Sequence, residues 1–137
     1  MQLYRLAYAS LVNKKLTKTD LRSILSKSVV NNTRDNVTGA LLFNSGIFLQ
    51  ALEGPRSSLN VTYRRIAQDA RHERVELIGM EPAKDRLFKA WTMGLIEDNE
   101  AAKKVLMKCW GSDKPVVEYL GLSEVFEMMH AMITGAK

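Results

Sequence analysis

The sequence predicts one α+β domain in which two helices cover one face of a mixed β-sheet, followed by helices at the C-terminus. Three observations predict this fold. The chain has 137 residues, which fits one ordinary domain. Apolar residues recur with strand periodicity in five segments and with helix periodicity in two segments between them. These segments follow one another in the order β-α-β-β-α-β-β, which is the order of a ferredoxin-like sandwich.

The first strand and the first helix each carry a local signal. Residues 3–9 predict a strand with Tyr4, Leu6 and Tyr8 on one face and Leu3, Arg5 and Ala7 on the other, and Tyr8 is expected on the inner face. A helix follows, because an apolar stripe with three- and four-residue spacing begins after Thr19 or Asp20 and runs to about Asn32. Thr19 and Asp20 are both residue types that cap helix N-termini.

The remaining elements follow from apolar runs and from the residues that interrupt them. Asn44-Ser45-Gly46 is a hairpin signal between two apolar strands, and Gly54-Pro55 ends the second of them. A loop over 81–90, with one helical turn near Leu87-Phe88, separates the last two strands. The elements expected here are strands over 37–43 and 47–52, a helix from Ser57 or Ser58 to about Ala70, strands over 75–80 and 91–96, and helices over 101–110 and 123–133.

Composition excludes several classes of protein. Hydrophobic residues make up 46% of the chain and charged residues 26%, which is typical of a folded domain. Cys109 is the single cysteine, and the chain has only two histidines, His72 and His130. We therefore expect no disulfide and no metal site. No apolar run reaches the roughly 20 residues that span a bilayer, and the N-terminus lacks a secretory signal. We therefore expect a cytoplasmic protein that binds no membrane.

The charge distribution indicates where an anionic ligand would bind. The formal net charge is +5. Residues 1–96 carry 15 basic and 8 acidic side chains, whereas residues 97–137 carry 5 and 7. A basic excess of this kind fits a nucleic acid, an anionic lipid, a phosphorylated ligand or an ordinary solvated surface, and the charges alone leave the four open.

Polar residues interrupt the apolar faces at several positions. Gln50 alternates with apolar residues along its strand, Ser28 and Asn32 continue the apolar stripe of the first helix, and Trp91 and Met93 share one face of the last strand. One face of the second helix combines Thr62, Arg65, Ile66 and Asp69. Because a buried polar group without a partner costs about 1–3 kcal/mol, their convergence indicates a polar ligand between the helices, such as a planar heterocycle. A buried Tyr8 phenol also needs a partner, which Gln50 could supply.

The chain resembles the BLUF family, the flavin-binding modules that sense blue light. The resemblance covers residues 3 to 96 in family order and at family spacing. It implies a noncovalently bound flavin, FAD in the first place with FMN or riboflavin as alternatives, between the two helices. The matching stretches are Leu6 to Ser10, Asp20-Leu21 through Ile24-Leu25, Ser28, Asn31-Asn32, Val37 to Leu42, Gly46 to Gly54, Asp69 to His72, and Phe88 through Trp91 to Met93.

Individual residues take roles from this resemblance. It implies that Tyr8 is the redox-active tyrosine and that Gln50 bridges its phenol to the flavin. It implies that Asn32 holds the polar edge of the ring, with Asn31 as a neighbouring contact. The further implied flavin contacts are Ile24, Arg65, Ile66, Asp69 and Arg71, and the implied positions around Gln50 are Ser28, Trp91 and Met93.

The resemblance implies a photoreceptor and not an enzyme. Light would rearrange the hydrogen bonds among Tyr8, Gln50 and the flavin, and Trp91 or Met93 would relay the change to the last strand and the helices after it. The sequence leaves open which of these two residues faces the flavin in the dark. We expect a downstream signalling protein that binds in a light-dependent way, and self-association into a homo-oligomer.

The resemblance and the charge distribution also predict how the chain is divided into domains. We expect a flavin-binding domain over 1–96 and a helical extension over 97–137 that packs on it and contains no effector.

The main alternative to a photoreceptor is a basic ferredoxin-like RNA-binding module, but the glycine-aromatic signature of that fold is missing and we expect no direct nucleic-acid binding. A small-molecule enzyme would need a nucleophile beside a base, and Cys109 and His72 lie far apart in the expected topology.

Overall fold

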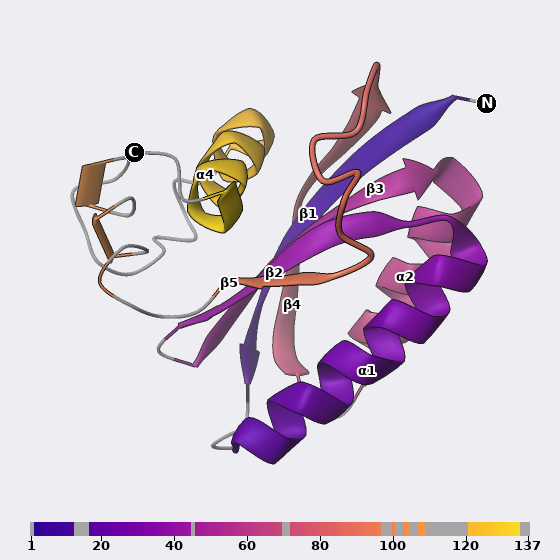
Figure 1. Cartoon of the computed structure of the whole chain (residues 1–137). Helices are drawn as coiled ribbons and strands as arrows, with labels where there is room; N and C mark the ends of the chain where they lie inside the picture. Colours follow the sequence, from indigo (N-terminus) through magenta and orange to yellow (C-terminus); the bar gives the residue numbers. More distant parts are fainter. Residues whose placement is uncertain are drawn as a thin grey trace.

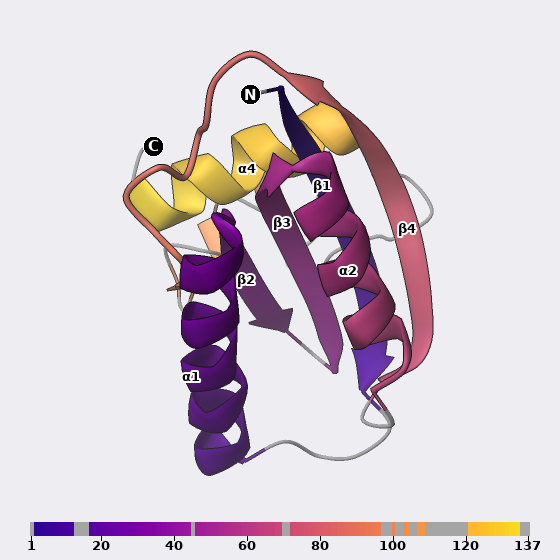
Figure 2. The same ribbon diagram turned by 90° about the vertical axis from the view of Figure 1, so that its right-hand side faces the viewer.

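In the described part of the chain, the fold is a five-stranded sheet with α1 and α2 on one face and α4 on the other (Figures 1 and 2). The computed structural model describes residues 2–12, 17–44, 46–69, 72–96, 100, 103–104, 107–108 and 121–134. Its elements are β1 (Leu3–Val12), α1 (Lys18–Asp35), β2 (Thr38–Asn44), β3 (Ile47–Pro55), α2 (Arg56–Ala67), β4 (His72–Ala83), β5 (Gly94–Ile96) and α4 (Leu122–Thr134). The predicted α+β sandwich is confirmed.

The strand order β4-β1-β3-β2-β5 places β1 and β3 at the centre of the sheet. β1 pairs antiparallel with both β3 and β4, and β2 pairs antiparallel with β3. The connections β1-α1-β2 and β3-α2-β4 are therefore two interleaved crossovers, both on the same face. β5 adds a parallel strand beside β2 at the edge, so the sheet is mixed as predicted.

α1 begins earlier and ends later than the sequence predicts. Its N-cap is Thr17, because Thr17 Oγ1 accepts the Asp20 backbone N–H while the Asp20 carboxylate accepts the Thr17 backbone N–H. Asp20 is thus the third residue of the helix and not its cap, and the predicted cap at Thr19 or Asp20 is wrong. The helix ends at Asp35, and its C-cap, Asn36, adopts the left-handed conformation with φ 59°.

α2 starts directly from the end of β3. Pro55, with φ −61°, occupies the N-cap position and provides no side-chain hydrogen bond, so the predicted cap at Ser57 or Ser58 is wrong. Proline suits the start of a helix because its φ is already fixed near the helical value. The helix ends at Ala67 and not near Ala70, which places Asp69 just beyond its C-terminus.

The connection between β4 and β5 differs most from the predictions. β5 covers only Gly94–Ile96, and residues 84–93 form bends and turns instead of extending the strand back to Trp91. The helical turn predicted near Leu87-Phe88 is absent from this described loop. The backbone N–H groups of both residues donate to the side chain of Glu53 instead. Most of the helix predicted over 101–110, with Cys109, lies outside the described residues; residues 103–104 and 107–108 are helical.

Two apolar clusters lie on the two faces of the sheet. The cluster under α1 and α2 includes Leu6, Tyr8, Phe48, Leu52 and Met93. The cluster on the opposite face joins Ala7, Ala9, Leu49 and Ala51 of the central strands to Val125, Phe126, Met128 and Met129 of α4. The methionine-rich side of α4 therefore covers the sheet, and Figure 1 shows the helix on the face opposite α1 and α2.

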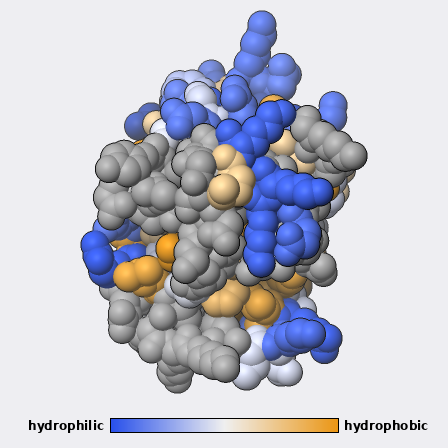
Figure 3. Space-filling view, turned by 90° about the vertical axis from the view of Figure 1, so that its left-hand side faces the viewer, coloured by the Kyte–Doolittle hydropathy of each residue, from blue (hydrophilic) through white to orange (hydrophobic). Residues whose placement is uncertain are grey.

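α4 approaches the sheet closely at β5. A Cβ atom placed on Gly94 would stand 2.1 Å from Cδ1 of Ile133. Seen from the α4 side, the surface carries only small apolar areas among hydrophilic residues and the residues that the structure does not describe (Figure 3). Among the helices of the described ranges, none has the length and apolar character needed to cross a bilayer.

Candidate functional site

A pocket lies between α1 and α2, with the central strands as its floor. Its volume is about 240 Å³. Ile24 of α1 and Ile66 of α2 supply aliphatic walls, and the polar groups come from the helices and from the floor. The lining residues are Tyr8, Ile24, Lys27, Ser28, Asn31, Asn32, Leu41, Phe48, Gln50, Thr62, Arg65, Ile66 and Asp69.

Tyr8 and Gln50 form the polar floor of this pocket. They lie directly opposite each other in the β1–β3 register, and the phenol of Tyr8 donates a hydrogen bond to Oε1 of Gln50. The amide Nε2 of Gln50 donates to Sδ of Met93 at 3.3 Å. The sequence left open whether the phenol and the amide touch, and the structure shows that they do. Gln50 is thereby placed between a strong partner, the phenol, and a weak one, the thioether.

The environment of Tyr8 keeps its phenol protonated. The residue is 2% exposed, and burial raises the pKa of its phenol well above the ordinary value, with a smaller contribution from the negative charge of Asp69. The ring of Tyr63 lies edge-on to that of Tyr8, with 6.0 Å between the ring centroids. Loss of the Tyr8 proton alone is therefore unfavourable in this site.

Asn32 ties the first helix to the loop before β5. Its side chain is buried, and Nδ2 donates to the carbonyl oxygen of Thr92 at 2.7 Å. Ser28 and Asn31 line the same wall of the pocket, and Lys27 adds a positive charge there. The apolar stripe of α1 thus supplies the polar groups that the sequence analysis singled out.

The second helix contributes an unpartnered polar atom. Thr62 Oγ1 is buried and has no hydrogen-bond partner among the described residues, although it lines the pocket. A buried hydroxyl without a partner costs about 1–3 kcal/mol, so this atom is a natural contact for a ligand. The site thus combines aliphatic walls with free hydrogen-bonding capacity, which fits a planar heterocycle with a polar edge such as a flavin.

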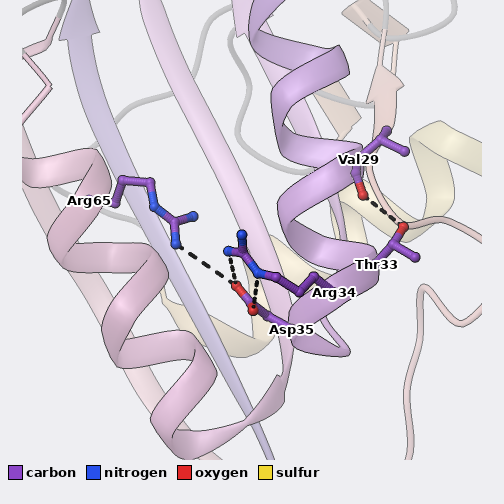
Figure 4. A network of polar contacts seen from close by, with 5 residues as sticks. All are labelled: Val29, Thr33, Arg34, Asp35 and Arg65. Atoms are coloured by element: carbon purple, nitrogen blue, oxygen red, sulfur yellow. Dashed lines mark hydrogen bonds and ion pairs between the residues drawn. The ribbon is translucent and has the colours of Figure 1, made fainter.

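An ion pair links the two helices beside the pocket. Arg65 of α2 reaches Asp35 of α1, with 3.9 Å between Nη2 and Oδ2 (Figure 4). Arg34 Nε donates to the same carboxylate at 2.8 Å, and this hydrogen bond lowers the pKa of Asp35 below its ordinary value. The other contact in Figure 4, from Thr33 Oγ1 to the carbonyl oxygen of Val29, stays within α1. Arg65 therefore lies between the pocket and a fixed negative charge.

Most of the residues singled out from the sequence lie together. The structure places Tyr8, Ile24, Ser28, Asn31, Asn32, Gln50, Arg65, Ile66 and Asp69 in the lining of one pocket. Met93 accepts the hydrogen bond from Gln50 in the cluster under α1 and α2, whereas Trp91 packs against the cluster under α4. The prediction that Trp91 and Met93 share a strand face is wrong, because both residues precede β5 and strand alternation does not apply to them. Arg71 lies outside the described residues.

The sequence analysis missed Tyr63 and Lys27 at the site and Glu53 on the opposite face of the sheet. Tyr63 follows Thr62 on the α2 stripe, and its spacing of four from Leu59 would have revealed it. Lys27 has the same kind of signal, because it stands three residues after Ile24 and directly before Ser28. Glu53 has none, because its role depends on a loop that no periodicity predicts. The described residues contain no group of three His, Cys, Asp or Glu side chains able to hold a metal ion.

Comparisons with known proteins agree with this geometry. The family model of the BLUF domain, described as sensors of blue-light using FAD, matches residues 3–94. The photoactivated adenylate cyclase subunit alpha of Euglena gracilis is 38% identical over 87 residues, which cover 64% of this chain and 8% of that protein. The chain thus spans about a tenth of the length of the curated relatives that it matches.

Two solved structures share nearly the whole fold. The dark-state structure of BlrB, a BLUF protein, has a TM-score of 0.80 at 29% identity and covers 95% of this chain and 96% of that chain. The photo-activated state of BlsA has a TM-score of 0.84 at 22% identity, with coverage of 96% and 94%. The BlsA similarity concerns the fold alone.

Proposed function

Since the chain belongs to the BLUF family of flavin-binding blue-light sensors, we propose that its light signal is a change of hydrogen-bond partner at Gln50. One observation carries this proposal. The amide of Gln50 has its oxygen on the phenol of Tyr8 and its nitrogen on the sulfur of Met93, at the floor of the pocket. When the amide turns, the phenol of Tyr8 can accept a hydrogen bond from Nε2 in place of the one it donated, and the bond that is lost is the weak one to the thioether.

The pocket supplies the groups that would hold the flavin. Ile24 and Ile66 would contact the two faces of the ring, and Asn31, Asn32 and Thr62 offer polar atoms to its edge. Arg65 and Lys27 bring positive charge to the same pocket, which suits the phosphates of FAD or FMN. The roles of Asp69 and Arg71 as further contacts remain predictions from the sequence.

The chain's own residues perform the proton movement. A bound flavin supplies the absorption of blue light and, once excited, the capacity to accept an electron. Burial keeps Tyr8 from releasing a proton alone, so its proton leaves only together with an electron. Oε1 of Gln50 is the acceptor within hydrogen-bonding reach. When electron and proton return, the Gln50 amide is left turned away from Met93, with no net oxidation of the protein.

Met93 would transmit the change of hydrogen-bond partner at Gln50 from the pocket to the rest of the sheet. Met93 is followed directly by β5, and Gly94 of that strand lies against Ile133 of α4. Light would therefore alter the position of β5 against α4, and the signal would pass to a partner protein at that side of the sheet. Some curated relatives are photoactivated adenylate cyclase subunits, which supports an effector as the receiver. Self-association and a cytoplasmic location remain predictions from the sequence.

The RNA-binding alternative has no support from the site. RNA-binding modules of this topology stack bases on aromatic residues of the open sheet face. Here that face carries alanine and leucine on the central strands, and α4 covers it. The pocket lies on the other face, between the helices.

An absorption spectrum taken before and after blue light tests the proposed function. The purified chain, reconstituted with FAD, should be yellow and should show a small, reversible red shift of its flavin absorption after illumination. A chain that stays colourless with both FAD and FMN would contradict flavin binding. A chain that binds flavin but bleaches instead of shifting would contradict the hydrogen-bond mechanism alone.

A further inference from the structure

Glu53 is a buried carboxylate that holds the loop carrying Met93. Its residue is 1% exposed, and alternation along β3 places it on the face opposite Gln50. Oε2 of Glu53 accepts the backbone N–H of Leu87 at 2.7 Å, and Oε1 accepts that of Phe88 at 2.8 Å. The carboxylate thus binds two consecutive backbone groups of the β4–β5 loop.

These hydrogen bonds make the start of the loop a fixed point. A buried carboxylate is costly unless it is fully hydrogen-bonded, and bonds from N–H groups to a charged acceptor are among the strong ones. Arg86 holds the same region from outside, with hydrogen bonds to the carbonyl oxygens of Asn36 and Glu53 at 2.8 and 2.9 Å and to Thr38 Oγ1 at 2.9 Å. Residues 86–88 are therefore attached to the ends of β2 and β3.

Met93 lies a short distance along the chain from this fixed point. The Trp91 backbone N–H donates to the carbonyl oxygen of Phe88 at 3.0 Å, and the Trp91 carbonyl oxygen accepts the N–H of Gly39 at 3.0 Å. The path from Phe88 to Met93 is thus short and tied to the sheet.

We propose that Glu53 is a positioning residue that sets the contact between Gln50 Nε2 and Met93 Sδ by fixing Leu87 and Phe88. The inference rests on the proposed function, in which light breaks that contact and the dark reaction restores it. Loosening the loop would destabilise the dark arrangement, and return to it would become slower.

The variant Glu53→Gln tests the proposal at two levels. Glutamine keeps the shape but turns one acceptor oxygen into an NH₂ group that faces a backbone N–H. We expect amide hydrogen exchange at Leu87 and Phe88, measured by NMR in the flavin-free and the flavin-loaded protein, to become about tenfold faster. We expect dark recovery to become about threefold slower. Glu81→Gln is the matched control, because the carboxylate of Glu81 accepts its hydrogen bonds from Arg5 on β1, whereas that of Glu53 accepts from the loop backbone.

A double-mutant cycle shows whether Glu53 acts through Met93. In a Met93→Ala background, Glu53→Gln should still accelerate exchange at Leu87 and Phe88 but should leave dark recovery unchanged. Equal slowing in both backgrounds, or unchanged exchange, would overturn the proposal. Should Glu53→Gln fail to fold, Arg86→Met loosens the same loop and is subject to the same two outcomes.

The cycle also separates this proposal from the proposed function. If Met93→Ala alone leaves both the light-induced shift and the recovery unchanged, the Gln50–Met93 contact has no part in the signal, and Glu53 loses its proposed role with it. If Met93→Ala changes the recovery and Glu53→Gln does not, the proposed function stands and the role of Glu53 is refuted.

Discussion

Met93 and Trp91 lie on opposite faces of the sheet, although only Thr92 separates them. Met93 is 8% exposed and accepts the hydrogen bond from Gln50, whereas Trp91 packs against the cluster that α4 covers. Thr92 itself accepts the hydrogen bond from Asn32. This short segment therefore reaches both faces of the sheet, and in this structure Met93, and not Trp91, is the hydrogen-bond partner of Gln50.

The first prediction concerns this division of roles. Met93→Ala should alter the light-induced shift or its recovery, because Gln50 Nε2 loses its acceptor. Trp91→Ala should leave the shift intact and lower the free energy of unfolding by about 2 kcal/mol, because it removes packing under α4. Light-minus-dark spectra and urea denaturation of both variants measure the two effects. A lost shift in Trp91→Ala with an unaffected Met93→Ala would reverse the assignment.

Replacing the central amide should separate flavin binding from the light response. Gln50→Ala removes both the acceptor for Tyr8 and the donor to Met93, while the walls of the pocket stay in place. We expect the variant to bind FAD and to lose the reversible red shift. Gln68→Ala, at the exposed C-cap of α2, is the control. A normal shift in Gln50→Ala would refute the partner exchange.

Replacing Thr62 should raise the stability of the flavin-free protein and lower its affinity for flavin. Thr62→Val removes a buried hydroxyl that lacks a partner, so the flavin-free protein should become about 1 kcal/mol more stable. Flavin affinity should fall about tenfold, because the same hydroxyl is free to bind the ligand. Calorimetry of the flavin-free protein and a flavin titration measure the two changes. The control is Thr33→Val, since Thr33 bonds within α1 and is exposed.

The buried phenol predicts a loss of stability at high pH. The pKa of Tyr8 in the folded protein lies above its ordinary value of 10.0, so the unfolded chain loses this proton first. The stabilisation is complete below that value and declines as pH rises, by about 1.4 kcal/mol per unit above about pH 10. Urea denaturation of the flavin-free protein at two alkaline pH values should show this decline. Tyr8→Phe should lack it, and an equal decline in both proteins would contradict the prediction.

Periodicity predicted the parts of the fold that regular elements control. The facing of Tyr8 and Gln50, and the polar stripe on α1, follow from spacings of two, three and four residues. The loop before β5 could not be predicted in this way, because its path depends on Glu53 and Asn32, which lie far away in sequence. The cap of α1 was misplaced because Asp20 can serve both as a cap and as the third residue of a capping box.

The close approach of Gly94 to Ile133 has a mechanical consequence. No side chain separates the β5 backbone from the α4 side chain there, and a single added methyl group would overlap with Cδ1. Interiors packed at this density transmit strain instead of absorbing it. A small outward shift of β5, a strand of three residues, would therefore press on Ile133 and move α4 with it. In the proposed mechanism, this glycine couples a movement of β5 to α4.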